Sequence, residues 1–155
     1  MCTSSQKAAL EAHYELMLRW NAKLNLTRIT DRAEAWERHY KESMFLAHKL
    51  PAGPLRIADV GSGAGFPGIP IAIVRPECTV TLIESHQRKS VFLREATRDL
   101  PNVRVLAMRA EDVTETFDWI VSRAVSPEDV VKLNLAPNIA LLTGRNEVSV
   151  PRGTL

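Results

Sequence analysis

Asp59-Val60-Gly61-Ser62-Gly63-Ala64-Gly65-Phe66 is the stretch that decides the fold of this 155-residue chain. It follows the apolar run 55–58, which predicts a buried strand, and precedes residues 69–74, which predict the start of a helix. A strand, a glycine turn and a helix N-terminus in this order are the layout of a nucleotide-binding α/β unit. Alternating glycines let the backbone turn tightly and approach a ligand without Cβ collisions, and the helix N-terminus beyond them offers unpaired N–H groups.

The spacing of the glycines separates two classes of nucleotide site. A dinucleotide fingerprint, G-x-G-x-x-G, would need glycine where Phe66 stands. The pattern Asp-x-Gly-x-Gly-x-Gly is instead typical of methyltransferases that use S-adenosylmethionine. Glu84 ends the run 79–83 and supplies a carboxylate at the tip of the second predicted strand, where it can accept hydrogen bonds from both ribose hydroxyls. The alternative is a glycine-rich surface turn and an unrelated glutamate, but the order and the βαβ spacing favour a nucleotide site.

The composition is that of an ordinary globular domain, with 45% apolar and 25% charged residues. No apolar run approaches the ~20 residues of a membrane span, and residues 1–5 lack a basic-then-apolar secretion signal. Cys2 and Cys78 have no metal-binding spacing and make no disulfide framework, so we expect a reducing cytoplasm and no metal. The net charge of +2 permits a nucleic-acid partner but does not require one.

The first third of the chain predicts two helices. Apolar residues at helical spacing predict an amphipathic helix over residues 4–20, with Ser4 or Ser5 as its cap. Asp31 predicts the cap of a second helix, with Glu34 as its capping-box partner, that ends near residue 50.

From residue 55 onward the sequence alternates strands and helices. The predicted strands are 55–60, 79–84, 103–107, 118–123 and 139–143, and the predicted helices are 68–74, 87–99 and 127–134. This alternation implies a doubly wound, mostly parallel sheet that binds its ligand outside the carboxyl ends of the strands. We therefore expect one domain, residues 1–155, with an N-terminal helical extension at 1–53 and an α/β core at 54–155.

Basic residues are frequent in the predicted helical extension. Two interpretations stay open: a basic rim, or a solvated helix face with pairs such as Glu34–Arg38 and Glu37–Lys41. Charge alone favours the solvated face. The residues concerned are Arg19, Lys23, Arg28, Arg32, Arg38 and Lys41.

Several segments resemble the motifs of one family. Residues 59–70, DVGSGAGFPGIP, are similar to the glycine motif of the small-subunit ribosomal RNA methyltransferase G family, also called glucose-inhibited division protein B. The Phe-Pro-Gly-Ile-Pro continuation is more specific than the glycines. The other similar segments, in the same order, are Trp20-Asn21 with Asn25-Leu26-Thr27, His39 to Ser43 with Glu42 in place of Asp, Arg88-Lys89 with Phe92-Leu93, Arg109 to Glu111, and Ser122 to Ala124.

The resemblance implies a Rossmann-like class I S-adenosylmethionine-dependent methyltransferase that modifies N7 of a guanine in small-subunit ribosomal RNA. We also expect a monomer. The resemblance places Asn25, His39, Arg109 and Arg123 at the methyl end of the cofactor or at the RNA, as candidate catalytic residues. The implied cofactor-binding residues are Asp59, Gly61, Gly63, Gly65 and Phe66 along the methionine and adenosine, Glu84 at the ribose, Ala110 and Glu111 at the adenine, and Arg123.

Methyl transfer to guanine N7 requires few catalytic groups. N7 carries an in-plane lone pair and no proton, so the protein has to position the reactants and exclude water rather than supply a base. Arg123 is expected at a strand tip, where it could hold guanine O6 or an RNA phosphate; the alternative is a structural ion pair. His39, taken alone, is more often a helix histidine satisfied by its neighbours.

The C-terminal end departs from the family pattern. Thr143-Gly144 stands where the family has Lys-Gly, and residues 147–151 resemble a strand that should come later. Either the chain is shortened or residues are missing after Gly144, and we expect Glu147 to Val150 to form a strand beyond the fifth. Two further functions stay open: a cofactor- or RNA-binding module without turnover, and a small-molecule methyltransferase.

Overall fold

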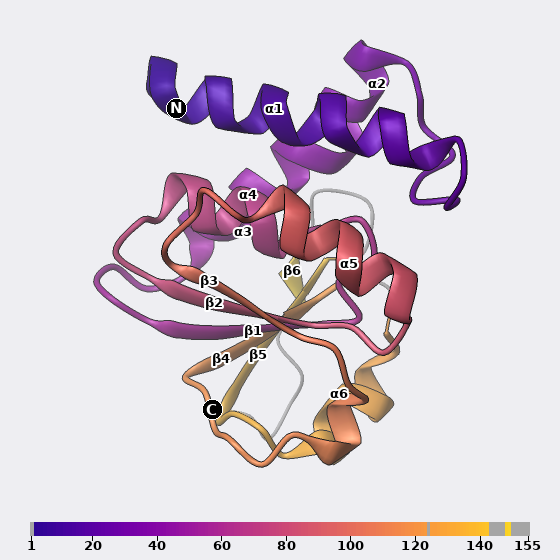
Figure 1. Ribbon diagram of the computed structural model, residues 1–155. Coiled ribbons are helices and arrows are strands. Elements are labelled where there is room, and N and C mark those ends of the chain that lie inside the picture. The colour runs from indigo at the N-terminus through magenta and orange to yellow at the C-terminus, as the bar shows by residue number, and fades with distance from the viewer. Residues whose placement is uncertain (1, 124, 143–147, 150–155) are drawn as a thin grey trace.

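The computed structural model describes residues 2–123, 125–142, 148 and 149, and its centre is a six-stranded sheet (Figure 1). The strands are β1 (Arg56–Val60), β2 (Thr79–Ile83), β3 (Val103–Leu106), β4 (Trp119–Ser122), β5 (Asn138–Leu142) and β6 (Val148–Ser149). They lie in the order β3-β2-β1-β4-β5-β6; β1 to β5 are parallel and β6 is antiparallel to β5. The predicted doubly wound, mostly parallel α/β sheet is confirmed.

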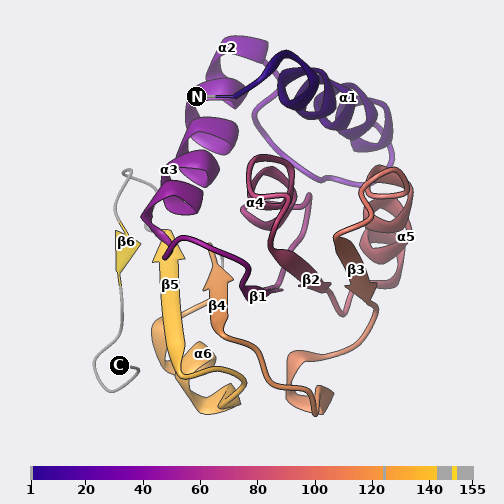
Figure 2. The same cartoon turned by 90° about the vertical axis from the view of Figure 1, so that its left-hand side faces the viewer.

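Helices cover both faces of this sheet. They are α1 (Ser4–Asn21), α2 (Arg32–Ala35), α3 (Glu42–Lys49), α4 (Gly68–Val74), α5 (Gln87–Ala96) and α6 (Pro127–Leu133). In Figure 2, α4 and α5 lie over one face with α1 outside them, whereas α6 covers the opposite face. Helix α1 therefore forms an additional layer above the α/β sandwich, whereas α3 packs against α4 and β5.

The central strands are buried on both faces, as a parallel sheet between helices requires. Residues 57–60 of β1 and 80–83 of β2 are all buried. Ile57 joins the core on the α1, α4 and α5 side, and its neighbour Ala58 joins the core on the α6 side, because successive side chains of a strand point to opposite faces. With both faces packed, the carboxyl ends of the strands are the place for a ligand.

The helix caps agree with the predictions in one case and differ in the other. Thr3, rather than either serine that follows it, caps α1: its hydroxyl accepts a hydrogen bond from the Gln6 N–H (3.1 Å), and the Gln6 side chain accepts one from the Thr3 N–H (2.9 Å). This reciprocal pair satisfies two helix-end donors at once. Asp31 caps α2 as predicted, because its carboxylate accepts a hydrogen bond from the Glu34 N–H at 2.9 Å.

The helix predicted after Asp31 is not regular. A π-helical segment, η1 (Trp36–Lys41), lies between α2 and α3. Such a segment holds an extra residue in one turn and is common at functional sites. Both His39 and Tyr40 of this segment are buried, so the irregular turn directs two polar rings toward the interior.

The strand predicted after the fifth is present in its described part. Ser149 pairs with Leu141 and Val148 pairs with Leu142, which places β6 beside β5. The other predicted strand residues, Glu147 and Val150, and the junction after Gly144 lie outside the described residues.

Candidate active site

The glycine turn after β1 has the conformation that its sequence predicts. Gly61, Gly63 and Gly65 have φ of 72°, 58° and 103°, the left-handed region that side chains rarely adopt. At Gly65 an added Cβ would collide with the Ile69 side chain, whereas at Gly63 it would meet no atom within 4 Å. The turn therefore packs closely on α4 at one point and presents bare backbone to open space at another, as a ligand cradle requires.

Glu84 holds this turn from the tip of the neighbouring strand. The side chain is buried, and its Oε1 accepts a hydrogen bond from the Gly63 N–H at 2.7 Å. Its Oε2 accepts one from the His86 N–H at 3.0 Å, which fixes the carboxylate between two strand ends. The predicted acidic residue is thus beside the predicted glycines, with a lone pair of each oxygen still available to a ligand.

Asp59 lies behind the turn rather than in front of it. Its side chain is 0% exposed, and Oδ2 accepts a hydrogen bond from the Gly68 N–H at 2.9 Å, at the start of α4. Oδ1 is buried with no hydrogen-bond partner in the described part of the chain, and burial raises the pKa of this carboxyl to about 7. Asp59, a predicted cofactor-binding residue, therefore shapes the turn through Gly68.

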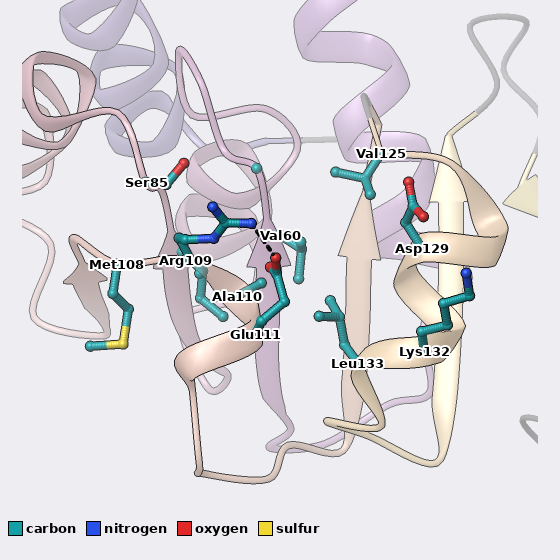
Figure 3. Close-up of a pocket in the computed structure, with 12 residues that line it drawn as sticks. Val60, Ser85, Met108, Arg109, Ala110, Glu111, Val125, Asp129, Lys132 and Leu133 are labelled. Atoms are coloured by element: carbon teal, nitrogen blue, oxygen red, sulfur yellow. Dashed lines mark hydrogen bonds and ion pairs between the residues drawn. The ribbon is translucent and has the colours of Figure 1, made fainter.

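A cavity of about 650 Å³ opens beside the turn, within the size range of small-molecule sites (Figure 3). It lies at the carboxyl ends of β1 to β4, where the strand order reverses between β1 and β4. Four predicted site residues line it: Gly61, Arg109, Ala110 and Glu111. The remaining lining residues are Val60, Ile83, Ser85, Met108, Val125, Asp129, Lys132 and Leu133.

Two segments far apart in the sequence form facing walls of the cavity. Figure 3 shows Met108 and Glu111 on one side, and Val125 and Leu133 on the other. The apolar side chains make a slot that suits a flat ring, and Glu111 offers a carboxylate at its edge. The predictions missed the α6 side, although the residues at 129, 132 and 133 share one helix face by their spacing.

The resemblance groups Arg109 with His39 and Arg123. In the structure, Arg109 lies instead among the residues that line the cavity. Its guanidinium donates to the Glu111 carboxylate at 2.8 Å, and both side chains are largely exposed, at 71% and 59%. An exposed ion pair of this kind contributes little to stability. Arg109 is therefore free to rearrange at the mouth of the cavity.

Arg123, His39 and Phe66 form a second cluster at the other end of the glycine turn. Nη1 of Arg123 donates to Nδ1 of His39 at 2.9 Å. The His39 ring stacks on Phe66, with centroids 4.4 Å apart and an interplanar angle of 14°, and the Arg123 guanidinium lies 5.1 Å from the Phe66 centroid. The structure thus joins three predicted residues from three separate segments.

The hydrogen bonds of His39 define its proton. Arginine can only donate, so Nδ1 of His39 accepts and the ring is neutral, with its proton on Nε2. Nε2 then donates to Oγ1 of Thr27 at 2.8 Å. Burial, with a smaller contribution from the positive charge of Arg123, lowers the pKa of His39 to about 4. The uncharged His39 ring therefore fixes the orientation of Arg123.

The loop that carries Thr27 is held by a residue outside the predicted site. Oδ1 of Asn21 accepts hydrogen bonds from the N–H groups of Leu26 (2.7 Å) and Thr27 (2.9 Å). Asn25, a predicted catalytic residue, lies exposed in this loop. The Asn-Leu-Thr segment thus reaches the Arg123 cluster through its threonine.

His13 of α1 is a second functional candidate that the sequence analysis missed. Nε2 of His13 donates to the Ala64 carbonyl of the glycine turn at 2.8 Å, and Nδ1 accepts from the Tyr40 hydroxyl at 2.7 Å. Burial lowers the pKa of His13 to about 4, so the ring is neutral. The N-terminal layer is therefore hydrogen-bonded directly to the turn.

No helix among the described residues is both long and apolar enough to cross a membrane. Within residues 2–123, 125–142, 148 and 149, no three histidine, cysteine, aspartate or glutamate side chains are grouped so that they could hold a metal ion.

Two solved structures illustrate the shared architecture. A SAM-dependent methyltransferase from Aquifex aeolicus matches with a TM-score of 0.57 and 18% identity over 76% of this chain and 69% of that one. TYW2 from P. horikoshii, solved in complex with MeSAdo, matches with a TM-score of 0.58 and 20% identity over 77% of this chain and 46% of that one. At these identities the likeness shows the fold, which is that of Rossmann-like class I methyltransferases.

Relatives with higher identity carry one name, ribosomal RNA small subunit methyltransferase G. The protein of Nostoc punctiforme is 38% identical over 83% of this chain and 58% of its own length. That of Roseiflexus castenholzii is 44% identical over 74% of this chain and 53% of its own length, so the chain spans between half and three fifths of these relatives. The family model for rRNA small subunit methyltransferase G matches residues 6–147. The chain belongs to the rRNA small subunit methyltransferase G family.

Proposed function

We propose that this protein transfers a methyl group from S-adenosylmethionine to N7 of a guanine in small-subunit ribosomal RNA. One observation carries the proposal. The glycine turn presents open space at Gly63, between Gly61, which lines the cavity, and Phe66, which belongs to the Arg123 cluster. A cofactor along this turn would have its adenosine on one side and its reactive end toward the half-buried Arg123 on the other.

The residues of the cavity fit such a cofactor. Met108, Val125 and Leu133 would enclose the adenine, with Glu111 at its edge. Glu84, already fixed by the Gly63 N–H, would accept hydrogen bonds from the ribose hydroxyls. When bound, S-adenosylmethionine supplies a methyl group made electrophilic by the positive charge on its sulfur.

Arg123 would position the target base. Its guanidinium keeps its proton and has five N–H donors, of which one goes to His39. The product base is cationic, so Arg123 should face guanine O6 or a phosphate rather than N7. His39 would act as a positioning residue, because its Nδ1 lone pair is committed to Arg123 and is unavailable as a base. N7 carries no proton, so the reaction requires no base.

The proposal also covers the setting of the reaction. Residues 1–155 would act as one domain and as a monomer, with the helices of residues 1–53 beside the cofactor turn. The protein would work in the cytoplasm, where ribosomal RNA is available. It would use no metal.

Transfer of a labelled methyl group tests the proposal against its two alternatives. Undermethylated small-subunit RNA, the assembled subunit and a panel of small-molecule acceptors are each incubated with the protein and labelled S-adenosylmethionine. The proposal expects label in the RNA or in the RNA of the subunit. Cofactor binding without transfer would support a binding module, and label only in small molecules would support a small-molecule methyltransferase.

A further inference from the structure

A second pocket, of about 470 Å³, lies where the end of α1 meets the start of α5. Figure 1 shows these two segments one above the other. Half of its lining is apolar and half is cationic. The lining residues are Leu16, Trp20 and Leu24, and Arg19, Lys23 and Arg88.

The three cations of this pocket have no acidic partner within the described residues. Arg88 donates to the carbonyl of Lys23 at 3.3 Å. Of the pairs that the solvated-face interpretation predicts, Glu37–Lys41 is present, whereas Glu34–Arg38 is not among the ion pairs of the described residues; Arg32 pairs with Glu11 and Glu15. Three cations without an acidic partner are thus grouped around this pocket, where they favour an anion.

Trp20 gives this pocket a rigid aromatic wall. Its indole meets the fully buried Phe92 edge to face, with centroids 5.7 Å apart. The side chain is only partly buried, so part of it remains accessible. A partly exposed aromatic ring flanked by cations is an arrangement on which proteins stack unpaired nucleotides while holding the phosphates.

The pocket lies at the same edge of the sheet as the candidate active site. Arg88 is in the first turn of α5, which follows Glu84 at the end of β2. Lys23 and Leu24 belong to the loop that continues to Thr27, the hydrogen-bond partner of His39. A strand whose target base reached Arg123 would therefore pass close to Trp20.

We propose that this pocket binds an unpaired nucleotide of the RNA substrate that neighbours the target guanine. The base stacks on Trp20, and its phosphates are held by Arg19, Lys23 and Arg88. This inference rests on the proposed function for the identity of the partner, but it concerns RNA binding and not methyl transfer.

Two variants of equal charge test the inference. Arg19→Gln/Lys23→Gln/Arg88→Gln removes the cations of the pocket. Lys7→Gln/Arg94→Gln/Arg98→Gln removes three exposed cations elsewhere on α1 and at or just beyond the end of α5. The probe is a fluorescent single-stranded RNA dodecamer of mixed sequence, and its binding is followed by anisotropy over a range of salt concentrations.

The inference expects the pocket variant to bind this RNA at least tenfold more weakly. It also expects the slope of log K against log salt to fall by about 2, since each single-strand phosphate contact contributes about 0.7. The control variant should keep most of its affinity, and both should bind S-adenosylmethionine like the wild type. The inference would be overturned if the pocket variant and the control variant lost the same amount of RNA affinity. It would also be overturned if poly-glutamate displaced the labelled RNA as well as unlabelled RNA does, because the pocket would then be a general polyanion site.

Base stacking is tested separately. Trp20→Leu should weaken binding of the dodecamer but leave unchanged the binding of a dodecamer whose bases are replaced by abasic sites. Trp20→Phe keeps an aromatic ring, so it should keep most of the preference for the dodecamer with bases. An equal loss for both probes would reject the stacking. RNA binding is measured here without turnover, so its outcome is separate from that of the methyl-transfer assay. The pocket can fail to bind RNA in a protein that transfers methyl groups, and it can bind RNA in a protein that transfers none.

Discussion

Nδ1 of His39 accepts a hydrogen bond from Arg123 at 2.9 Å, although 84 residues separate the two in the chain. The bond joins the N-terminal helical layer to the end of β4. It requires His39 to be neutral, and the His39 ring is buried against Phe66, which disfavours its charged form. The orientation of Arg123 therefore depends on pH through His39.

The stability of the protein should depend on this neutrality. In the folded chain the pKa of His39 is about 4, against 6.5 for the free side chain. The unfolded state therefore binds more protons between about pH 6.5 and 4, and stability falls as the pH drops through this range. The pKa of His13, also about 4, acts in the same direction, whereas the raised pKa of Asp59, about 7, opposes them because the folded state holds that proton.

His39→Asn should therefore flatten the acid side of the stability profile. The difference in unfolding free energy between wild type and variant should shrink, by on the order of 1–3 kcal/mol, from about pH 7 to about pH 4.5. Urea unfolding at several pH values measures it. His48→Asn, at an exposed histidine, should leave the profile unchanged. Parallel profiles for wild type and His39→Asn would show that His39 does not carry the effect.

Arg123→Ala should reduce methyl transfer to RNA about 10- to 100-fold, the scale of a lost charged hydrogen bond. Arg123→Lys should lose less, because the charge remains and only the fork geometry is lost. The sequence alone places Arg123 at a strand tip and says nothing of its partner. In the structure, Arg123→Ala also removes the donor to Nδ1 of His39, so the unfolding free energy of the variant should fall by about 1–3 kcal/mol.

Rates and stabilities are measured on the same preparations, so that unfolding is not mistaken for lost catalysis. If Arg123→Ala methylates RNA at the original rate with normal cofactor binding, Arg123 has only a structural role.

Gly63→Ala should weaken binding of S-adenosylmethionine, because the new Cβ would enter the space in front of the turn. Gly53 provides a matched control: it also has positive φ, 94°, and an open environment, but it precedes the amino end of β1, whereas the cavity lies at the carboxyl ends of the strands. Both variants should lose about 1 kcal/mol of unfolding free energy from backbone strain. Calorimetry should show reduced cofactor affinity for Gly63→Ala and not for Gly53→Ala. Unchanged affinity in folded Gly63→Ala would place the cofactor elsewhere.

Tyr40→Phe should weaken cofactor binding several-fold through His13. It removes the hydroxyl that donates to Nδ1 of His13, and so loosens the ring that holds the Ala64 carbonyl. The unfolding free energy should fall by about 1–2 kcal/mol, the cost of an unsatisfied buried acceptor. Tyr14→Phe also removes a hydroxyl hydrogen bond, to the Thr30 carbonyl at 2.8 Å, but it is not linked to the turn. Equal cofactor affinities in the two variants would contradict a role for His13.

Much of the fold was predictable because its signals are local. A strand buried on both faces is a continuous apolar run, and glycines at positive φ mark the turn whatever surrounds them. Glu84 was predictable for the same reason, since the residue after a strand lies at the ligand edge.

The rest depends on packing between distant segments. The π-helical turn at His39 leaves no signature in the hydrophobic pattern, and the bond from His13 to Ala64 joins residues 51 positions apart. The glycine motif includes Asp59, but it does not predict the hydrogen bond that the Asp59 carboxylate accepts from the Gly68 N–H at the start of α4. The α6 wall of the cavity follows from topology that a linear pattern does not contain.

The position of the transferred methyl group tests the central claim most directly. RNA methylated by the wild type is reduced with borohydride and treated with aniline, which cleaves the strand at N7-methylguanine. The account predicts cleavage at a guanine of the small-subunit RNA only after incubation with both protein and S-adenosylmethionine, and greatly reduced cleavage with Arg123→Ala. Two results would contradict the account: transfer of a labelled methyl group to the RNA without cleavage at a guanine, and cleavage of RNA treated with Arg123→Ala to the same extent as of RNA treated with the wild type.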